Sequence, residues 1–242
     1  QDMIFDKYDV IVVGGGHAGC EAAAAAANMG NRTLLITMNM NAMAAMSCNP
    51  AVGGIAKGQI VREIDALGGQ MGIVADKTMI QFRMLNKSKG PAVWSPRVQS
   101  DKFEFAAEWR SVLEKIYNLD FWQDHVDSLI VEGDVIRGVR CQMGGDIYSK
   151  AVILTNGTFL NGKIFIGEKS FSGGRISESA SHGITEQLVS LGFESDRMKT
   201  GTPMRIDGRS IDFSRLSEQK GDDDVTGFSY LEVEKPKQQR SC

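Results

Sequence analysis

Long apolar runs, proline and histidine are scarce in this sequence, and each scarcity excludes a class of protein. No apolar run approaches the roughly 18 to 20 residues that a membrane-spanning helix needs, so we expect no association with a membrane. Proline occurs only 5 times in 242 residues, which excludes collagen-like and proline-rich disordered chains. We recognise no signal peptide before the first predicted strand.

Cysteine is also scarce, and its placement favours free thiols. The cysteines are Cys20, Cys48, Cys141 and Cys242, and no pair has the short spacing of a zinc knuckle or a redox Cys-x-x-Cys motif. A chain of this length does not need disulfides, so we expect a protein of the reducing cytoplasm. The 3 histidines are equally scattered, and we expect no metal site.

Glycine, by contrast, is abundant. The chain has 27 glycines, and its hydrophobic fraction of 42% and charged fraction of 24% are those of a globular protein. Much glycine with little proline suits an α/β fold whose turns approach a ligand closely. The net charge of −3 gives no global argument for nucleic-acid binding.

The charge is unevenly distributed, because residues 51–100 form a basic band. The band carries seven basic side chains against three acidic ones. A band of this size is typical of a solvated face, and binding of a polyanion is the alternative. Its basic members are Lys57, Arg62, Lys77, Arg83, Lys87, Lys89 and Arg97.

The first 37 residues carry the clearest motif. An apolar, β-branched strand is predicted at 8–13, a helix at 20–29 and a second strand at 33–37. Between the first strand and the helix lies Gly14-Gly-Gly-His-Ala-Gly19, which fits the G-x-G-x-x-G dinucleotide fingerprint. Its glycines permit a tight turn and a close approach of backbone amides to a pyrophosphate. We interpret it as a nucleotide-cofactor site, the alternative being a glycine turn that binds nothing.

One part of this fingerprint is missing. The acidic residue expected about 20 positions further on, which would bind the ribose hydroxyls, is absent. The second strand leads into Asn39, whose side chain could form one such hydrogen bond. The motif alone therefore leaves FAD and NAD undecided.

The remainder of the chain shows further elements. A helix is predicted from Gly53 or Gly54 to Gly68, and Asp101 caps another helix whose buried stripe is Phe103, Ala106, Trp109, Leu113 and Ile116. Strands at 126–131, 135–141 and 147–154 form a β-meander, and a helix is expected at 181–191. Lys87–Pro91 and Phe171–Arg175 are predicted loops.

Ser47-Cys-Asn-Pro50 is the second candidate site. A cysteine placed just before a helix N-terminus and near Lys57 is where the pKa of a thiol falls, and a thiolate is a nucleophile or a base. The residues alone favour a buried, inert Cys48. Cys20 and Cys141 are predicted core residues, and His17 is expected to be structural rather than a proton-transfer group.

Several of these stretches together resemble the GidA (MnmG) family. The resemblance lies in Val12–Ala22, Ser47–Gly58, Glu63–Gly69 and Asn86–Val93, and in the shorter motifs Thr158–Lys163, Ser172–Arg175 and Lys199–Pro203. It implies an α/β fold: a Rossmann-like, glutathione-reductase-like FAD-binding domain with a parallel sheet and a β-meander, over residues 1–200. Residues 201–242 would begin an inserted α+β domain. Family members are more than twice as long, so the chain is expected to be an N-terminal fragment.

The resemblance also implies a function and site residues. The family uses FAD, NADH and a folate-derived one-carbon donor, with the GTPase MnmE as partner, to modify C5 of the wobble uridine of tRNA. It would be a homodimer when full length. By the resemblance, Gly14, Gly15, Gly16, His17, Ala18, Gly19, Val126 and Ser181 bind FAD. Cys48 matches one of two catalytic cysteines. Given a tRNA substrate, the basic band itself leads us to expect that Lys87 and Lys89 hold tRNA phosphates.

Two other functions remain as alternatives. One is a general FAD/NAD(P)H oxidoreductase of the disulfide-reductase fold, which would need a redox cysteine pair or a second glycine fingerprint. The other is a non-catalytic, nucleotide-dependent RNA-binding module.

Overall fold

The computed structural model describes residues 7–236 and 238–241, and Cys242 lies outside this range. The chain divides into two compact units. Unit 1 comprises residues up to Ala45 together with Trp109–Arg197, and unit 2 comprises Met46–Glu108 and the residues from Met198 onward. The expected boundary between two domains at residue 200 stays a prediction. No helix of the described residues is long and apolar enough to cross a membrane.

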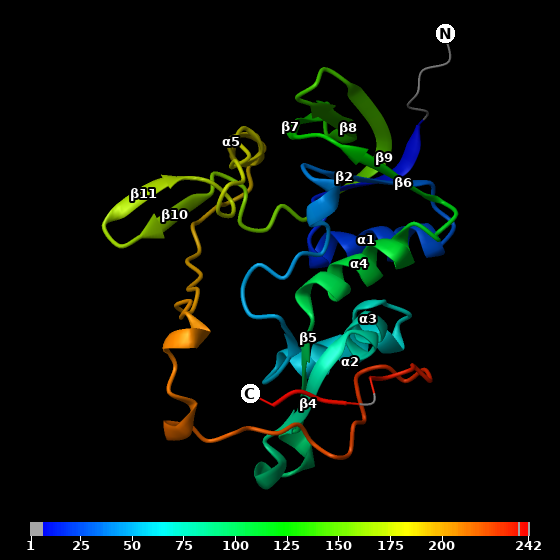
Figure 1. The fold of residues 1–242 in the computed structure, drawn as a ribbon. Helices are drawn as coiled ribbons and strands as arrows, with labels where there is room; N and C mark the ends of the chain where they lie inside the picture. Colours follow the sequence, from blue (N-terminus) through cyan, green and yellow to red (C-terminus); the bar gives the residue numbers. More distant parts are fainter. Residues whose placement is uncertain (1–6, 237, 242) are drawn as a thin grey trace. The chain divides into compact units, whose positions relative to one another are not determined.

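Unit 1 is built on a six-stranded sheet of order β6-β2-β1-β9-β8-β7 (Figure 1). The strands are β1 Tyr8–Val13, β2 Thr33–Thr37, β6 Leu119–Gln123, β7 Val126–Glu132, β8 Val135–Cys141 and β9 Asp146–Leu154. β1 pairs in parallel with β2 and β9, and β2 in parallel with β6, whereas β7, β8 and β9 pair antiparallel. The predicted parallel sheet with a β-meander is confirmed. β6 was not foreseen.

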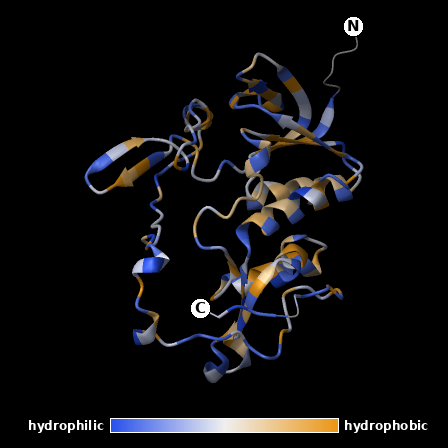
Figure 2. Ribbon diagram, in the orientation of Figure 1, coloured by the Kyte–Doolittle hydropathy of each residue, from blue (hydrophilic) through white to orange (hydrophobic). Residues whose placement is uncertain are grey.

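The two faces of the parallel strands are covered by different elements. Side chains alternate along a strand, so Val12 lies on the face opposite Ile11 and Val13. Helix α1, His17–Asn28, contacts the parallel strands through buried alanines, and Figure 2 shows its apolar character. Ile11 and Val13 instead join a core cluster with residues of β2, β7, β8 and β9 and with Ile184 of helix α5, Ile184–Ser190.

Two predictions in unit 1 are wrong in their bounds. Residues 171 and 172 belong to strand β11, Lys169–Ser172, which pairs antiparallel with β10, Lys163–Ile166. The expected helix at 181–191 begins only at Ile184, because Gly183 takes a φ of +100° and Ser181 lies in an extended segment that bridges Leu160.

Unit 2 holds a three-stranded sheet of order β3-β5-β4 with two helices. The strands are β3 Ala51–Gly53, β4 Met79–Leu85 and β5 Ser95–Ser100, and the helices are α2 Lys57–Ala66 and α3 Met71–Lys77. The prediction of a helix from Gly53 or Gly54 is wrong, because the chain first pairs as β3 with β5. Short 3-10 helices at Lys87–Lys89, Pro91–Val93, Gly208–Ser210 and Phe213–Arg215, and one at Met40–Ala42 in unit 1, complete the described elements.

Helix α4, Lys102–Leu113, passes from one unit to the other. Asp101 caps it as predicted, because its Oδ1 accepts N–H groups of Phe103 and Glu104 at 2.9 and 3.2 Å. The predicted stripe is wrong at its start, since Phe103 is 75% exposed and Phe105 is fully buried. It is also wrong at its end, because Ile116 lies beyond the end of the helix at Leu113. The buried positions are Phe105, Trp109 and Leu113, at successive intervals of four residues.

A C-terminal strap, which we define as residues 219–236 and 238–240, completes unit 2. Its backbone runs beside edge strand β4, where the N–H of Asp222 donates to Phe82 O at 2.9 Å and that of Arg240 to Ile80 O at 2.7 Å. Phe228 is fully buried, and its amide donates to both carboxylate oxygens of Asp76, at 2.8 and 2.9 Å. The strap therefore covers a sheet edge that would otherwise expose unpaired backbone groups.

Replacing Phe228 by alanine is expected to loosen unit 2 selectively. Phe→Ala at a fully buried site costs about 3–5 kcal/mol. Hydrogen exchange of the β4 amides should accelerate accordingly, while β1 and β2 keep their protection. Phe213→Ala, at a side chain that is 69% exposed in the same unit, is the matched control. Unchanged protection in β4 of the Phe228→Ala chain would contradict an anchoring role.

Candidate nucleotide-cofactor site

The turn between β1 and α1 is held in place by the end of β9. The Thr155 hydroxyl lies 2.9 Å from the carbonyl oxygens of both Val13 and Gly14, and its amide donates to Val13 O at 2.9 Å. Because β1 and β9 are parallel, their carboxyl ends meet at the same edge of the sheet. This edge is where open α/β sheets bind ligands. Sequence reasoning placed a strand end at Thr155 but missed that its side chain locks the turn.

Three of the four glycines in the turn are required by the protein itself. Gly14 has a φ of +107°, and a Cβ there would lie 2.6 Å from Thr155 O. A Cβ at Gly15 would lie 2.8 Å from Thr37 Oγ1, and one at Gly19 would overlap Gly14 O. These glycines give the tight turn and the close packing of helix on strand that the fingerprint predicts.

Gly16 differs from the other three. It is exposed, its φ of −76° is open to any residue, and a Cβ there would meet no atom within 4 Å. No contact within the described protein requires glycine at this position. The space above Gly16 is therefore available to a ligand that approaches the backbone.

The N-terminus of α1 carries positive potential into this space. The helix begins at His17, three residues before the predicted start, so His17, Ala18 and Gly19 form its first turn. Gly16 caps it without a side-chain hydrogen bond, and its first turn holds no acidic residue. The N–H groups at a helix start and the helix dipole together favour an anion such as a phosphate.

His17 fastens the helix start to the following loop. Its Nε2 lies 3.0 Å from Ala44 O, and the imidazole is half-buried. Burial lowers the pKa of His17, and the positive charge of Arg175 adds to the effect, although the Ala44 carbonyl opposes it. The contact supports the structural role that was expected for His17.

Two polar side chains hold the loop that follows β2, where the fingerprint would place the missing ribose acid. The Asn39 Oδ1 accepts the N–H of Asn41 at 2.9 Å, so this side chain is already engaged in a local turn. Gln123 Oε1 accepts the N–H of Met40 at 2.9 Å and ties the same loop to β6. A hydrogen bond from Asn39 to a ribose stays a prediction, and the role of Gln123 was not foreseen.

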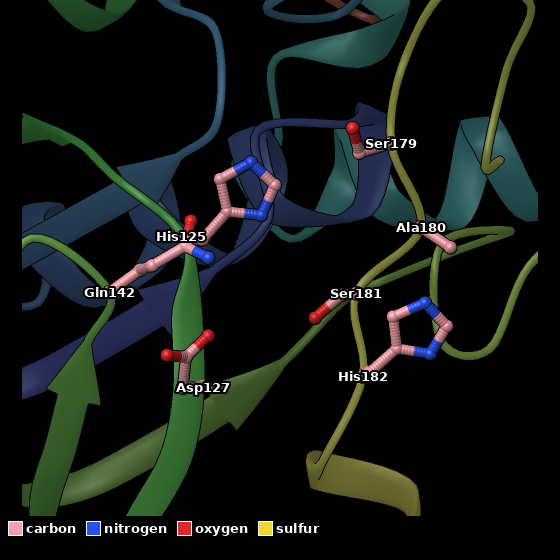
Figure 3. A pocket seen from close by; sticks show the side chains of 7 residues that line it. All are labelled: His125, Asp127, Gln142, Ser179, Ala180, Ser181 and His182. Atoms are coloured by element: carbon pink, nitrogen blue, oxygen red, sulfur yellow. The ribbon is translucent and has the colours of Figure 1, made fainter.

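A polar cavity of about 180 Å³ lies beside the start of β7 in unit 1 (Figure 3). Figure 3 shows Asp127 of β7 and the segment of Ser181 and His182 facing each other across it. The Oδ1 of Asn161 lies 2.8 Å from His182 Nδ1 and helps to position that wall. The lining residues are His125, Asp127, Gln142, Ser179, Ala180, Ser181 and His182.

Val126 and Ser181, which are predicted to bind the cofactor but lie outside the glycine turn, differ in whether their side chains line this cavity. Ser181 lines it. Val126 lies between His125 and Asp127, but its own side chain is buried in the core cluster. Any contact of Val126 with a ligand must therefore use its backbone.

Cys48 lies in unit 2 and is exposed, so the expectation from the residues alone that it is buried is wrong. Its expected place just before a helix is also wrong, because β3 separates it from the start of α2 at Lys57. The Arg205 guanidinium donates to Cys48 O at 3.0 Å and fixes the backbone there. An exposed thiol on a fixed backbone is accessible to a substrate.

The other described cysteines behave as predicted core residues. Cys20 and Cys141 are free and buried. Burial raises the pKa of each thiol to about 12, so neither ionises near neutral pH. Within residues 7–236 and 238–241, no group of three or more His, Cys, Asp or Glu side chains could hold a metal ion.

The basic band of residues 51–100 is partly neutralised within unit 2. Lys87 Nζ pairs with Asp222 of the strap at 2.9 Å, and Lys77 pairs with Glu108 at 2.7 Å. Arg62 stacks on the ring of Tyr230 at 4.7 Å. Binding of tRNA phosphates by Lys87 and Lys89 stays a prediction, and for Lys87 it requires competition with Asp222.

Three features define the class of this chain as a Rossmann-type α/β protein with a dinucleotide-binding turn. They are the βαβ unit at its start, the α1 N-terminus without a side-chain cap and the open space above Gly16. The family model described as "Glucose inhibited division protein A" matches residues 9–242. The chain belongs to this GidA (MnmG) family, whose fold is of the FAD-binding flavoprotein type.

Relatives and a solved structure agree with this assignment. A protein of Flavobacterium johnsoniae, named "tRNA uridine 5-carboxymethylaminomethyl modification enzyme MnmG", is 65% identical over 99% of this chain and 39% of its own length. A Cytophaga hutchinsonii protein of the same name is 64% identical over the same shares. The Aquifex aeolicus GidA structure has a TM-score of 0.93 at 48% identity, covering 98% of this chain and 40% of that chain. The chain thus spans 39% of the length of these curated relatives.

The pKa of His17 is a direct probe of the turn. With its pKa lowered in the folded state, the stability linked to neutral His17 is complete above pH 6.5 and is lost as the pH falls through the folded-state pKa. A bound anion at the adjacent helix start should raise this pKa. NMR titration with and without FAD measures both effects, and His17→Asn assigns the signal. A pKa at or above 6.5 in the free protein would contradict the geometry.

Proposed function

We propose that this chain, as part of a longer protein, binds FAD through its Gly14–Gly19 turn. The pyrophosphate would lie over Gly16 and accept the N–H groups of His17 and Ala18 in the first turn of α1. Ser181 and the backbone of Val126 would border the cofactor at the polar cavity. What supports this is the open space above Gly16, together with the membership in a family of flavoprotein fold.

We further propose that the whole protein modifies tRNA by installing a carboxymethylaminomethyl group at C5 of uridine. The names of the relatives carry this proposal. In detail, we propose that the uridine is the one at the wobble position, that NADH is the reductant and that a folate derivative donates the one-carbon unit. The GTPase MnmE would be the partner, and the full-length protein would be a homodimer in the cytoplasm. FAD would supply the redox chemistry that the transfer of a one-carbon unit requires.

Cys48 would act on the uridine itself. A thiolate that adds to C6 of uridine turns C5 into an enolate-like carbon, which can attack an electrophile. Loss of the C5 proton and departure of the thiolate then restore the double bond. The exposure of Cys48 supports this role, because C6 of a uridine must reach Sγ. Proton transfer by the same thiol is the second possibility.

Gly16→Val tests the cofactor site. The branched side chain would fill the pyrophosphate space while meeting no protein atom within 4 Å, so the full-length variant should fold and lose its flavin absorbance. Gly145→Val is the matched control, since its Cβ also meets nothing within 4 Å in unit 1. A Gly16→Val protein that retains stoichiometric FAD would contradict the assignment.

Cys48→Ser tests the catalytic thiol. Sulfur and oxygen are nearly isosteric, so FAD content and tRNA affinity of the full-length protein should stay near wild type. The rate of nucleoside modification should fall by orders of magnitude, because a serine hydroxyl is scarcely ionised near neutrality. Nucleoside analysis of treated tRNA measures the rate. A near-normal rate, or loss of FAD instead, would contradict a catalytic role of the Cys48 thiol.

A further inference from the structure

Trp94 is the most exposed of the three tryptophans in this chain. It is 42% exposed, whereas Trp109 is fully buried and Trp122 is half-buried. An indole ring has a large apolar surface, whose burial contributes strongly to the stability of a core or an interface. Val93, its neighbour in sequence, is 41% exposed as well. Unit 2 therefore presents an aromatic ring to its surroundings at the entry to β5.

Three hydrogen bonds hold Trp94 in place despite its exposure. The indole Nε1 donates to Lys87 O at 3.2 Å, and the backbone N–H donates to Pro91 O at 3.2 Å. The carbonyl of Trp94 accepts Nε2 of Gln59, in helix α2, at 3.1 Å. A side chain that is already fixed loses little conformational entropy when a ligand binds. Because the N–H donor of the indole is engaged, the ring itself is the part that can contact a ligand.

The chain around Trp94 is positively charged. Residues 86–97 contain three basic side chains, Lys87, Lys89 and Arg97, and no acidic one. Lys87 pairs with Asp222 at 2.9 Å. Lys89 is exposed, and no carboxylate of the residues that the structure describes forms an ion pair with it. A fixed aromatic ring beside an unpaired cation complements a nucleic-acid strand, which offers a flat base and a phosphate at each step.

Strand β5 separates Trp94 from Cys48. Because β3 and β5 are antiparallel and the N–H of Ser100 donates to Pro50 O at 2.8 Å, the Cys48 segment adjoins the C-terminal end of β5. Trp94 directly precedes the other end of β5, at Ser95. A strand of this length spans about 20 Å. A base that stacks on Trp94 is therefore a different one from a uridine that reacts at Cys48.

We propose that Trp94 is an RNA-binding residue, whose indole ring stacks on a base of the substrate tRNA other than the target uridine. The inference rests on the proposed tRNA substrate. Lys89 would hold a phosphate of the same strand. Stacking on an aromatic side chain tolerates every base, because each base has a π face. Trp94 would thus add affinity and orient the RNA strand without selecting its sequence.

The experiment measures the affinity of the full-length protein for unmodified tRNA over a series of salt concentrations. Trp94→Ala should weaken binding by about fivefold or more, with an unchanged salt slope, because stacking releases no counterions. Lys89→Ala should instead lower the slope by about 0.7 to 0.9, the contribution of one phosphate. Trp94→Phe keeps an aromatic ring and should recover most of the affinity. Tyr117→Ala, at a side chain that is 98% exposed in unit 1, is the control and should change neither quantity.

Tryptophan fluorescence separates stacking from a structural role of the same side chain. The difference between the wild-type and Trp94→Phe spectra gives the emission of Trp94, which tRNA should quench. Equal losses of affinity in Trp94→Ala and Trp94→Phe would overturn the proposal, since the Nε1 hydrogen bond and not the ring would then matter. Emission that tRNA leaves unquenched would overturn it as well.

The same measurements distinguish this inference from the proposed function. A wild-type protein that binds tRNA while Trp94→Ala binds it equally well would refute the role of Trp94 alone. A wild-type protein that binds no tRNA would refute the proposed substrate, and the role of Trp94 with it.

Discussion

The close approach of the β1–α1 turn to the end of β9 is the constraint on which the rest of unit 1 depends. Gly14 must lie against Thr155, and Gly19 must lie against Gly14, so that the helix starts immediately after the strand. This approach orients the first amides of α1 toward the carboxyl edge of the sheet. It also holds Thr155, the first residue after β9, beside the turn. The geometry of the candidate phosphate site is therefore set by backbone packing more than by any single polar side chain.

The elements that the sequence predicted well are those specified by short-range patterns. β1 and β2 are continuous apolar runs, β8 is bounded by turns, and the fingerprint needs only glycines at fixed spacing. Strand β4 gives a weaker signal, because Gln81 and Arg83 interrupt its apolar residues and Gln81 is nevertheless buried. Gln81 is satisfied by the carbonyls of Gln219 and Arg240 in the strap, far away along the chain.

The candidate site shows the same difference between residues with local roles, which the sequence predicted, and residues with distant partners, which it did not. The glycines were identified because their roles are local, and Ser181 only because it matched a family position. Thr155 and Gln123 were missed, since each acts on a partner that is distant in sequence. Cys48 was placed before a helix because Gly53 and Gly54 resemble a helix start. The preference of residues 51–53 for pairing with β5 prevailed over that local pattern.

The strap and the pairing of β1 with β9 also set an order of events during synthesis. Val13 meets Thr155 across 142 positions of sequence, and Asp76 meets Phe228 across 152. Because a ribosome delivers the chain from its N-terminus, the central strand β1 lacks its second neighbour until β9, Asp146–Leu154, has been made. The edge of β4 waits longer still, exposed to pairing with other chains. During synthesis, each of these two strands therefore lacks one neighbour for the time that the ribosome needs to make the intervening residues.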